Sequence, residues 1–168
     1  VEIVRSCITD PDRVASAMQG VDWVVHLAAQ VSVPRSIEDP RESYRINVDG
    51  TLNIVDSARI AGVQRVVFAA SSAAYGDNQE MPLREEFMPR PLSPYASGKL
   101  AGEQLMRVWA ECYGMHTTMR HVANIFFIFP CLLAFFLRLA VVWEWTFGIS
   151  TNTCLDVLKS FSMAIVLV

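Results

Sequence analysis

The pattern that most constrains this chain is an alternation of short apolar runs with longer amphipathic segments over residues 10–122. Residues 21–29 and 66–70 are almost entirely apolar, which is typical of strands that are buried on both faces of a sheet. An Asp-Pro or Ser-Pro pair, which caps and starts a helix, precedes each amphipathic segment. The order predicts a doubly wound α/β fold around a parallel sheet.

The predicted elements place several polar residues at one edge of that sheet. The predicted strands are residues 2–4, 21–29, 64–70 and 117–122, and the predicted helices are residues 10–20, 39–62 and 94–113. A glycine closes each helix, at Gly20, Gly62 and Gly114. Doubly wound sheets bind ligands across the carboxyl ends of their strands. Residues 26–30, residues 71–75 and the start of the third helix are therefore expected to lie together.

The candidate catalytic residues lie within residues 71–99. Ser71 directly follows an apolar run, and a Ser-Pro pair starts a helix on which Tyr95 and Lys99 share one face. An ammonium beside a phenol favours the phenolate, so a tyrosine in such a pair can exchange a proton with a substrate hydroxyl. If hydride leaves the same carbon, the reaction is an alcohol oxidation and needs a hydride acceptor. A Tyr-x-x-x-Lys pair alone more often marks a surface helix.

Several motifs occur together and in order. They are residues 26–29 (His-Leu-Ala-Ala), 32–36 (Ser-Val-Pro-Arg-Ser), 47–51 (Asn-Val-Asp-Gly-Thr), 71–76 (Ser-Ser-Ala-Ala-Tyr-Gly) and 93–99 (Ser-Pro-Tyr-Ala-Ser-Gly-Lys). With them, residues 1–120 resemble the extended short-chain dehydrogenase/reductases, specifically the NAD-dependent nucleotide-sugar epimerases and dehydratases. Within that family the sequence looks most like the UDP-hexose and UDP-N-acetylhexosamine 4-epimerases. The resemblance implies a Rossmann-like sheet, NAD as cofactor, a nucleotide-sugar substrate, a homodimer and a cytoplasmic location.

The resemblance also implies roles for individual residues. Tyr95 matches the catalytic base and acid, Lys99 matches the lysine that binds the nicotinamide ribose, and Ser71 matches the residue that holds the sugar hydroxyl. Ser72 is an alternative to Ser71, because serine runs are easily misaligned. Cofactor contacts are implied for Leu27, Ala28, Ala29, Asn47, Ala69, Tyr95 and Lys99, and substrate contacts for Ser32, Arg35, Ser71 and Ser72. Residues 27–29 are explained equally well as an ordinary core strand, and Arg35 as a surface charge.

Two features depart from the family pattern, and a third narrows the choice of reaction within the family. The glycine-rich fingerprint of a first strand–helix unit is absent, and by resemblance the chain begins at the third strand. We therefore expect a partial sheet, an open edge on strand 21–27 and a chain that is inactive by itself. Cys7 stands where the family usually has an aspartate facing adenine. No Asp-Glu pair follows Ser71, which favours an epimerase over a dehydratase.

Residues 121–168 have a different composition, which predicts a boundary near residue 120. Only four charged residues follow it: Arg138, Glu144, Asp156 and Lys159. We expect an apolar, helical tail. Residues 122–137 carry no charge but fall short of the ~20 apolar residues of a membrane span. A shifted reading frame or an unspliced intron would give unpatterned sequence of this kind, and this interpretation is favoured over membrane attachment through residues 122–145. The alternative to an enzyme is a non-catalytic remnant with a membrane-seeking C-terminal segment.

Charge and cysteine content argue against several other functions. The net charge is −3 and basic residues do not cluster, so nucleic acid is not an expected partner. The cysteines are scattered in a way that predicts neither a metal site nor a disulfide framework: Cys7, Cys112, Cys131 and Cys154. We expect them to be small buried residues, which would fit a reducing cytosol, and we expect no signal peptide before the first strand.

Overall fold

The computed structural model describes residues 4–78, 80, 82–84, 86–121 and 163–166. The helices are α1 (Pro11–Ala17), α2 (Val33–Glu38), α3 (Pro40–Tyr44), α4 (Gly50–Ile60) and α5 (Pro94–Tyr113), with a π-helical turn η1 (Arg45–Asp49) and a 3-10 turn η2 (Ser72–Tyr75). The strands are β1 (Trp23–His26), β2 (Arg65–Ala70), β3 (His116–His121) and β4 (Met163–Val166).

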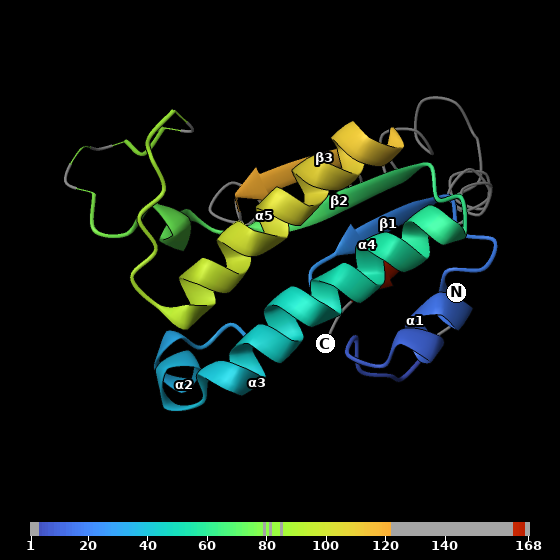
Figure 1. The fold of residues 1–168 in the computed structure, drawn as a ribbon, viewed down its shortest axis with the longest axis horizontal. Coiled ribbons are helices and arrows are strands. Elements are labelled where there is room, and N and C mark those ends of the chain that lie inside the picture. Colours follow the sequence, from blue (N-terminus) through green and yellow to red (C-terminus); the bar gives the residue numbers. More distant parts are fainter. Residues whose placement is uncertain (1–3, 79, 81, 85, 122–162, 167–168) are drawn as a thin grey trace, which may run out of the picture.

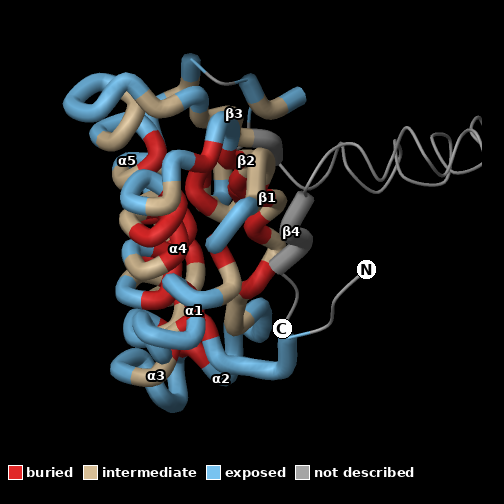
Figure 2. The backbone as a smooth tube through the Cα atoms, turned by 90° about the vertical axis from the view of Figure 1, so that its right-hand side faces the viewer, coloured by how far each residue is buried: buried red, intermediate tan, exposed pale blue. Residues whose placement is uncertain are grey.

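The four strands form one parallel sheet in the order β3-β2-β1-β4. The five helices lie together on one face of this sheet, and β1, β2 and β3 point the same way (Figure 1 and Figure 2). The predicted parallel α/β fold is confirmed. The loops that were expected to hold the functional residues lie at the carboxyl ends of the strands.

The core lies between the sheet and the helices. Val24 and His26 of β1 and Val66 and Phe68 of β2 alternate with less buried residues, and none of the four is more than 1% exposed. This period of two places them on the face that the helices cover. Gly102 in the middle of α5 lets the helix approach closely, because a Cβ there would lie 2.5 Å from the ring of Phe68.

Helix starts follow the capping residues that the sequence indicated. Asp10, Asp39 and Ser93 each accept a hydrogen bond from a backbone N–H in the first turn, and proline follows each of them. The segment predicted as one helix over residues 39–62 instead contains α3, the wider turn η1 and α4. The helix α2 was not predicted, although Ser32 caps it and Pro34 lies in its first turn.

Several other expectations are not met. The cysteines were expected to be buried, and this is wrong for Cys7 and Cys112, which are exposed. The outer edge of β1 was expected to be open, and this is wrong, because β4 pairs with β1 there. The strand predicted at residues 2–4 falls largely outside the described residues, and Val4 itself is not in a strand. Of the tail expected to be helical, residues 163–166 form a strand, while the possible membrane segment at residues 122–145 lies outside the described residues. Among the described residues, no helix is long and apolar enough to cross a membrane.

Candidate active site

Ser71 lies at the junction between β2 and the turn η2. Its backbone is extended, and its hydroxyl oxygen accepts a hydrogen bond from the N–H of Ala73 at 3.3 Å, which caps the turn. The turn ends at Gly76, whose φ of +67° suits glycine. Ser71 and Ser72 are both half-buried. The sequence Ser-Ser-Ala-Ala-Tyr-Gly thus converts the end of a buried strand into a tight turn that leaves two hydroxyls near the carboxyl edge.

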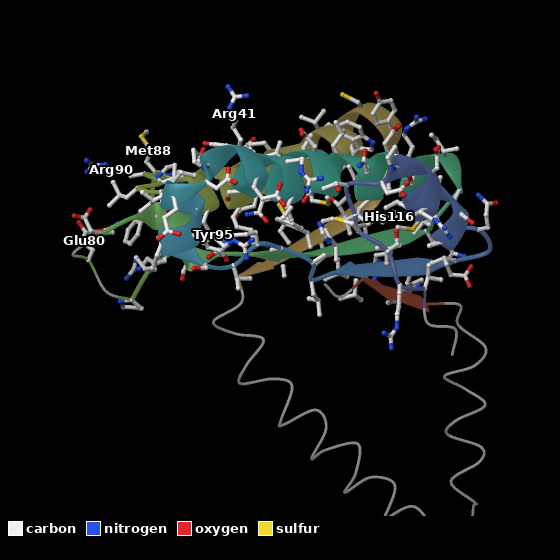
Figure 3. The ribbon with its side chains drawn as sticks, turned by 90° about the horizontal axis from the view of Figure 1, so that it is seen from below. Arg41, Glu80, Met88, Arg90, Tyr95 and His116 are labelled. Carbon is white, nitrogen blue, oxygen red and sulfur yellow. The ribbon has the colours of Figure 1, made fainter. Side chains whose placement is uncertain are left out.

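Tyr95 and Lys99 occupy the first two turns of α5. Ser93 fixes where the helix begins by accepting a hydrogen bond from the N–H of Ala96 at 3.1 Å, and Pro94 takes the first helical position. Tyr95 is half-buried and lies at the end of the molecule where β1, β2 and β3 end (Figure 3). Lys99 lies one turn later, next to β2. The cap and the proline together set the register of both side chains.

Lys99 is a buried cation that is held by the end of β2. The residue is 3% exposed, and its ammonium donates a 2.8 Å hydrogen bond to the carbonyl oxygen of Ala69, two residues before Ser71. The same nitrogen lies 4.8 Å from the centre of the Phe68 ring. Burial lowers the pKa of Lys99 from 10.5 to about 8, and the carboxylate of Glu103 opposes this shift. The amine therefore remains largely protonated at neutral pH.

Asn47 holds the loop that follows β1. Its side-chain oxygen accepts a 2.8 Å hydrogen bond from the N–H of Gln30, and its Nδ2 donates to the carbonyl oxygen of Gln30 at 3.1 Å. We call this pair of bonds the Asn47 clamp. Asn47 is 2% exposed and lies in η1, and wide helical turns of this kind are frequent at functional sites. A Cβ on Gly98 would lie 3.1 Å from the Cβ of Asn47, so this turn packs directly against α5.

The remaining predicted site residues divide into two groups. Residues 27–29 lie in the loop between β1 and the Asn47 clamp, with Ala28 buried and its neighbours half-buried. Ser32 and Arg35 are exposed at α2, and the Ser32 hydroxyl oxygen accepts a 3.3 Å hydrogen bond from the N–H of Arg35. The helix α2 packs against α5 and so borders the site. Neither Ser32 nor Arg35 is the hydrogen-bond partner of Lys99, which is the carbonyl oxygen of Ala69.

Two contributors to this site were missed from the sequence. Gln30 connects the clamp to α2, because its Nε2 donates to the Ser32 carbonyl oxygen at 3.0 Å, and no sequence signal points to it. Gly102 allows α5 to approach Phe68 closely. The sequence did contain a sign of this, because a glycine inside a helix is unfavourable unless close packing requires it.

A cavity of about 460 Å³ lies beside η2. It is lined by Tyr75, Asp77, Asn78, Glu80 and Arg90, and by none of the predicted catalytic side chains.

A buried histidine lies under the site. His26 Nε2 is 3.0 Å from the hydroxyl oxygen of Thr51, and that hydroxyl lies 2.8 Å from the carbonyl oxygen of Asn47, to which it donates. His26 Nε2 therefore donates to Thr51, and the ring is neutral. Burial, and to a smaller extent the charge of Lys99, lowers the pKa of His26 from 6.5 to about 3. His26 thus acts as a neutral core residue joining β1 to α4.

Residues 1–126 match the NAD dependent epimerase/dehydratase family, and the match contains all the site residues described above. The chain belongs to this family. It is 36% identical over 127 residues to the UDP-glucose 4-epimerase of Mycolicibacterium smegmatis, covering 74% of this chain and 41% of that protein. The expected family is therefore confirmed, and with it the Rossmann-like character of the sheet.

Solved structures of family members have the same fold. The UDP-N-acetylglucosamine 4-epimerase from Methanobrevibacter ruminantium, in complex with UDP-N-acetylmuramic acid, has a TM-score of 0.68 and 33% identity over 71% of this chain and 38% of its own. The UDP-glucose 4-epimerase of Thermus thermophilus, in complex with NAD, has a TM-score of 0.67 and 36% identity over 70% of this chain and 39% of its own. The chain thus spans about two fifths of the length of these relatives.

Proposed function

We propose that this chain carries the catalytic half of an NAD-dependent nucleotide-sugar 4-epimerase. The observation that carries the proposal is the buried Lys99 ammonium, held by the Ala69 carbonyl one helical turn from Tyr95. In this proposal Tyr95 accepts the proton of the sugar C4 hydroxyl, and Ser71 donates a hydrogen bond to the same oxygen. The positive charge of Lys99 stabilises the developing phenolate of Tyr95.

The nicotinamide half of NAD fits the residues that are present. Lys99 supplies a buried ammonium for the nicotinamide ribose, while Ala28, Ala29 and Ala69 supply small side chains at the strand ends, next to Leu27. NAD, when bound, supplies a hydride acceptor and later returns the hydride to the 4-keto sugar. The pyrophosphate half has no glycine-rich turn in this sequence to hold it. We therefore propose that the chain alone is inactive and that its chemistry requires the parts that its relatives contain.

The residue types that follow Ser71 favour an epimerase reaction over a dehydratase reaction. Loss of water from a sugar needs a further acid and base beside the oxidised carbon, and Ala73 and Ala74 in the turn after Ser71 cannot provide them. We also propose a homodimer and a cytoplasmic location, as implied by the family resemblance. The proposed boundary near residue 120 is supported by the family match, which ends at residue 126.

The experiment uses a complete protein in which residues 1–126 replace the matching segment of the M. smegmatis UDP-glucose 4-epimerase, referred to below as the chimera. We expect the chimera to interconvert UDP-glucose and UDP-galactose. Tyr95→Phe should lower kcat by about 10²–10⁴-fold, the usual size of a general acid–base contribution, while bound NAD is retained. Tyr113→Phe, at the far end of the same helix, is the matched control and should be fully active. Unchanged turnover in Tyr95→Phe would refute the assignment.

A further inference from the structure

The loop of residues 27–30, which follows β1, is bound at both ends by one short stretch of helix. At its beginning, the ring Nε2 of His26 donates to the hydroxyl oxygen of Thr51 at 3.0 Å. At its end, the Asn47 clamp bonds both the N–H and the carbonyl oxygen of Gln30. The Thr51 hydroxyl also donates to the Asn47 carbonyl oxygen at 2.8 Å, which closes a ring of bonds around the loop. We call His26, Thr51 and Asn47 the loop anchor.

Thr51 is the central member of the loop anchor. Its hydroxyl accepts a hydrogen bond from His26 and donates one to Asn47, so one group uses both of its hydrogen-bonding functions. His26, Thr51 and Asn47 are only 0%, 1% and 2% exposed, so water cannot replace a bond that is lost there. The other ring nitrogen of His26, Nδ1, has no hydrogen-bond partner among the described residues. The orientation of this ring therefore depends on the Thr51 hydroxyl.

The groups proposed for proton transfer are held by other bonds. The Ser93 cap sets the start of α5, and the ammonium of Lys99 bonds to the carbonyl oxygen of Ala69 at the end of β2. Neither bond includes a residue of the loop anchor. We therefore expect a change in the anchor to alter the loop of residues 27–30 and to leave the register of Tyr95 and Lys99 intact.

We propose that His26 and Thr51 are positioning residues for cofactor binding, which hold residues 27–29 in the arrangement that receives the nicotinamide half of NAD. This inference rests on the proposed function. Both side chains are buried, so they act through the loop and do not themselves touch a bound molecule. A loop that is already fixed loses less conformational freedom when a ligand binds, and this raises affinity. Loss of the Thr51 hydroxyl should weaken NAD binding and leave the turnover of NAD-loaded molecules nearly unchanged.

The test measures NAD affinity in the chimera after its bound NAD has been removed. In Thr51→Val, which lacks the hydroxyl, we expect the Kd for NAD to rise about 10-fold, the effect of about one hydrogen bond. Turnover at saturating NAD should change by less than about 2-fold. Thr51→Ser keeps the hydroxyl and should restore the affinity.

Thr117→Val is the matched control. It also removes a hydroxyl that donates to a helix carbonyl oxygen, that of Met106 at 3.1 Å, but it does so near the start of β3, at the opposite end of the strands from the site. Its Kd for NAD should equal that of the unmodified chimera. The comparison separates loss of one buried hydrogen bond in general from loss of the loop anchor.

Hydrogen exchange gives a second measurement that does not depend on NAD. Without NAD, we expect the amide of Gln30, which bonds to Asn47, to exchange at least about 10-fold faster in Thr51→Val than in Thr117→Val. If Thr51→Val does not fold, Thr51→Ala replaces it in both measurements.

Three results would each overturn the proposal: an unchanged Kd for NAD in Thr51→Val, unchanged exchange at Gln30, or a Thr51→Ser variant that binds NAD as weakly as Thr51→Val. A fall in turnover at an unchanged Kd would also overturn it, because the anchor would then position the catalytic residues. Full turnover in Tyr95→Phe would instead refute the proposed function, so the two failures can be told apart.

Discussion

The ammonium of Lys99 donates a 2.8 Å hydrogen bond to the carbonyl oxygen of Ala69, the penultimate residue of the strand that leads into Ser71. This bond joins the helix α5 to the end of β2. It fixes a positive charge one helical turn from Tyr95 and at the carbonyl two residues before Ser71, and these are the residues to which we assign the proton chemistry. Because Lys99 is almost fully buried, the site depends on the protonation of a group whose pKa burial has lowered to about 8.

The pKa of Lys99 can be measured directly, because Lys99 and Lys159 are the only lysines in the chain. We expect the ¹³Cε resonance of Lys99 to titrate near pH 8, well below the value of about 10.4 of a free lysine. Lys159→Arg assigns the two resonances. A midpoint above about pH 10 for Lys99 would contradict the buried environment that the structure shows.

The same shift predicts how stability depends on pH in the alkaline range. Between pH 8 and 10.5 an unfolded Lys99 binds a proton that the folded one has released, so the free energy of unfolding rises with pH. The contribution reaches about 3 kcal/mol at most. Urea unfolding at about pH 7.5 and about pH 10 should show this gain in the unmodified chain, and Lys99→Met should lack it. Equal pH dependence in the two proteins would contradict the prediction.

His26 predicts a loss of stability in acid. Its pKa is about 3 in the folded chain, so below pH 6.5 the unfolded chain takes up a proton that the folded chain does not. The free energy of unfolding should fall between pH 6.5 and pH 3 by up to about 5 kcal/mol from this group. His26→Gln, which keeps a donor for Thr51, should reduce that fall. An unchanged slope in His26→Gln would show that other groups cause the acid transition.

Gly102 lets α5 pack closely against β2, and a larger residue at this position should weaken that packing. In Gly102→Ala the new methyl group would lie 2.5 Å from the ring of Phe68, so the ring or the helix must move. We expect the free energy of unfolding to fall by about 1–3 kcal/mol, the usual cost of overpacking. Phe68→Leu combined with Gly102→Ala should recover part of the loss. Gln104→Ala, on the exposed face of the same helix, is the control for general effects on α5.

The Asn47 clamp requires an amide at position 47, so a carboxylate there should lower the stability of the chain. Asn47→Asp keeps the acceptor for the Gln30 N–H but replaces the donor to the Gln30 carbonyl oxygen. We expect a loss of about 1–3 kcal/mol in unfolding free energy, the usual cost of an unsatisfied buried polar group. In the control, Asn78→Asp, the acceptor for the Glu80 N–H remains, and stability should be unchanged. Equal stability of Asn47→Asp and the unmodified chain would contradict the clamp.

Sequence patterns predicted the parts of this molecule that depend on local chemistry. The caps Asp10, Asp39 and Ser93 mark helix starts that the structure confirms, and the apolar runs mark β1 and β2. The register of Tyr95 and Lys99 follows from Ser93 and Pro94. The wide turn η1, the pairing of Asn47 with Gln30 and the position of β4 depend on contacts between distant segments, and no local pattern contains them.

The most direct test of the proposed chemistry is the transient reduction of bound NAD in the chimera. When UDP-glucose is added in single turnover, we expect absorbance of reduced nicotinamide to appear and then to decay as UDP-galactose forms. In Tyr95→Phe, with NAD bound equally well, that absorbance should fail to appear on the same timescale. Reduction of the nicotinamide at the same rate in Tyr95→Phe would contradict the central claim that Tyr95 accepts the hydroxyl proton.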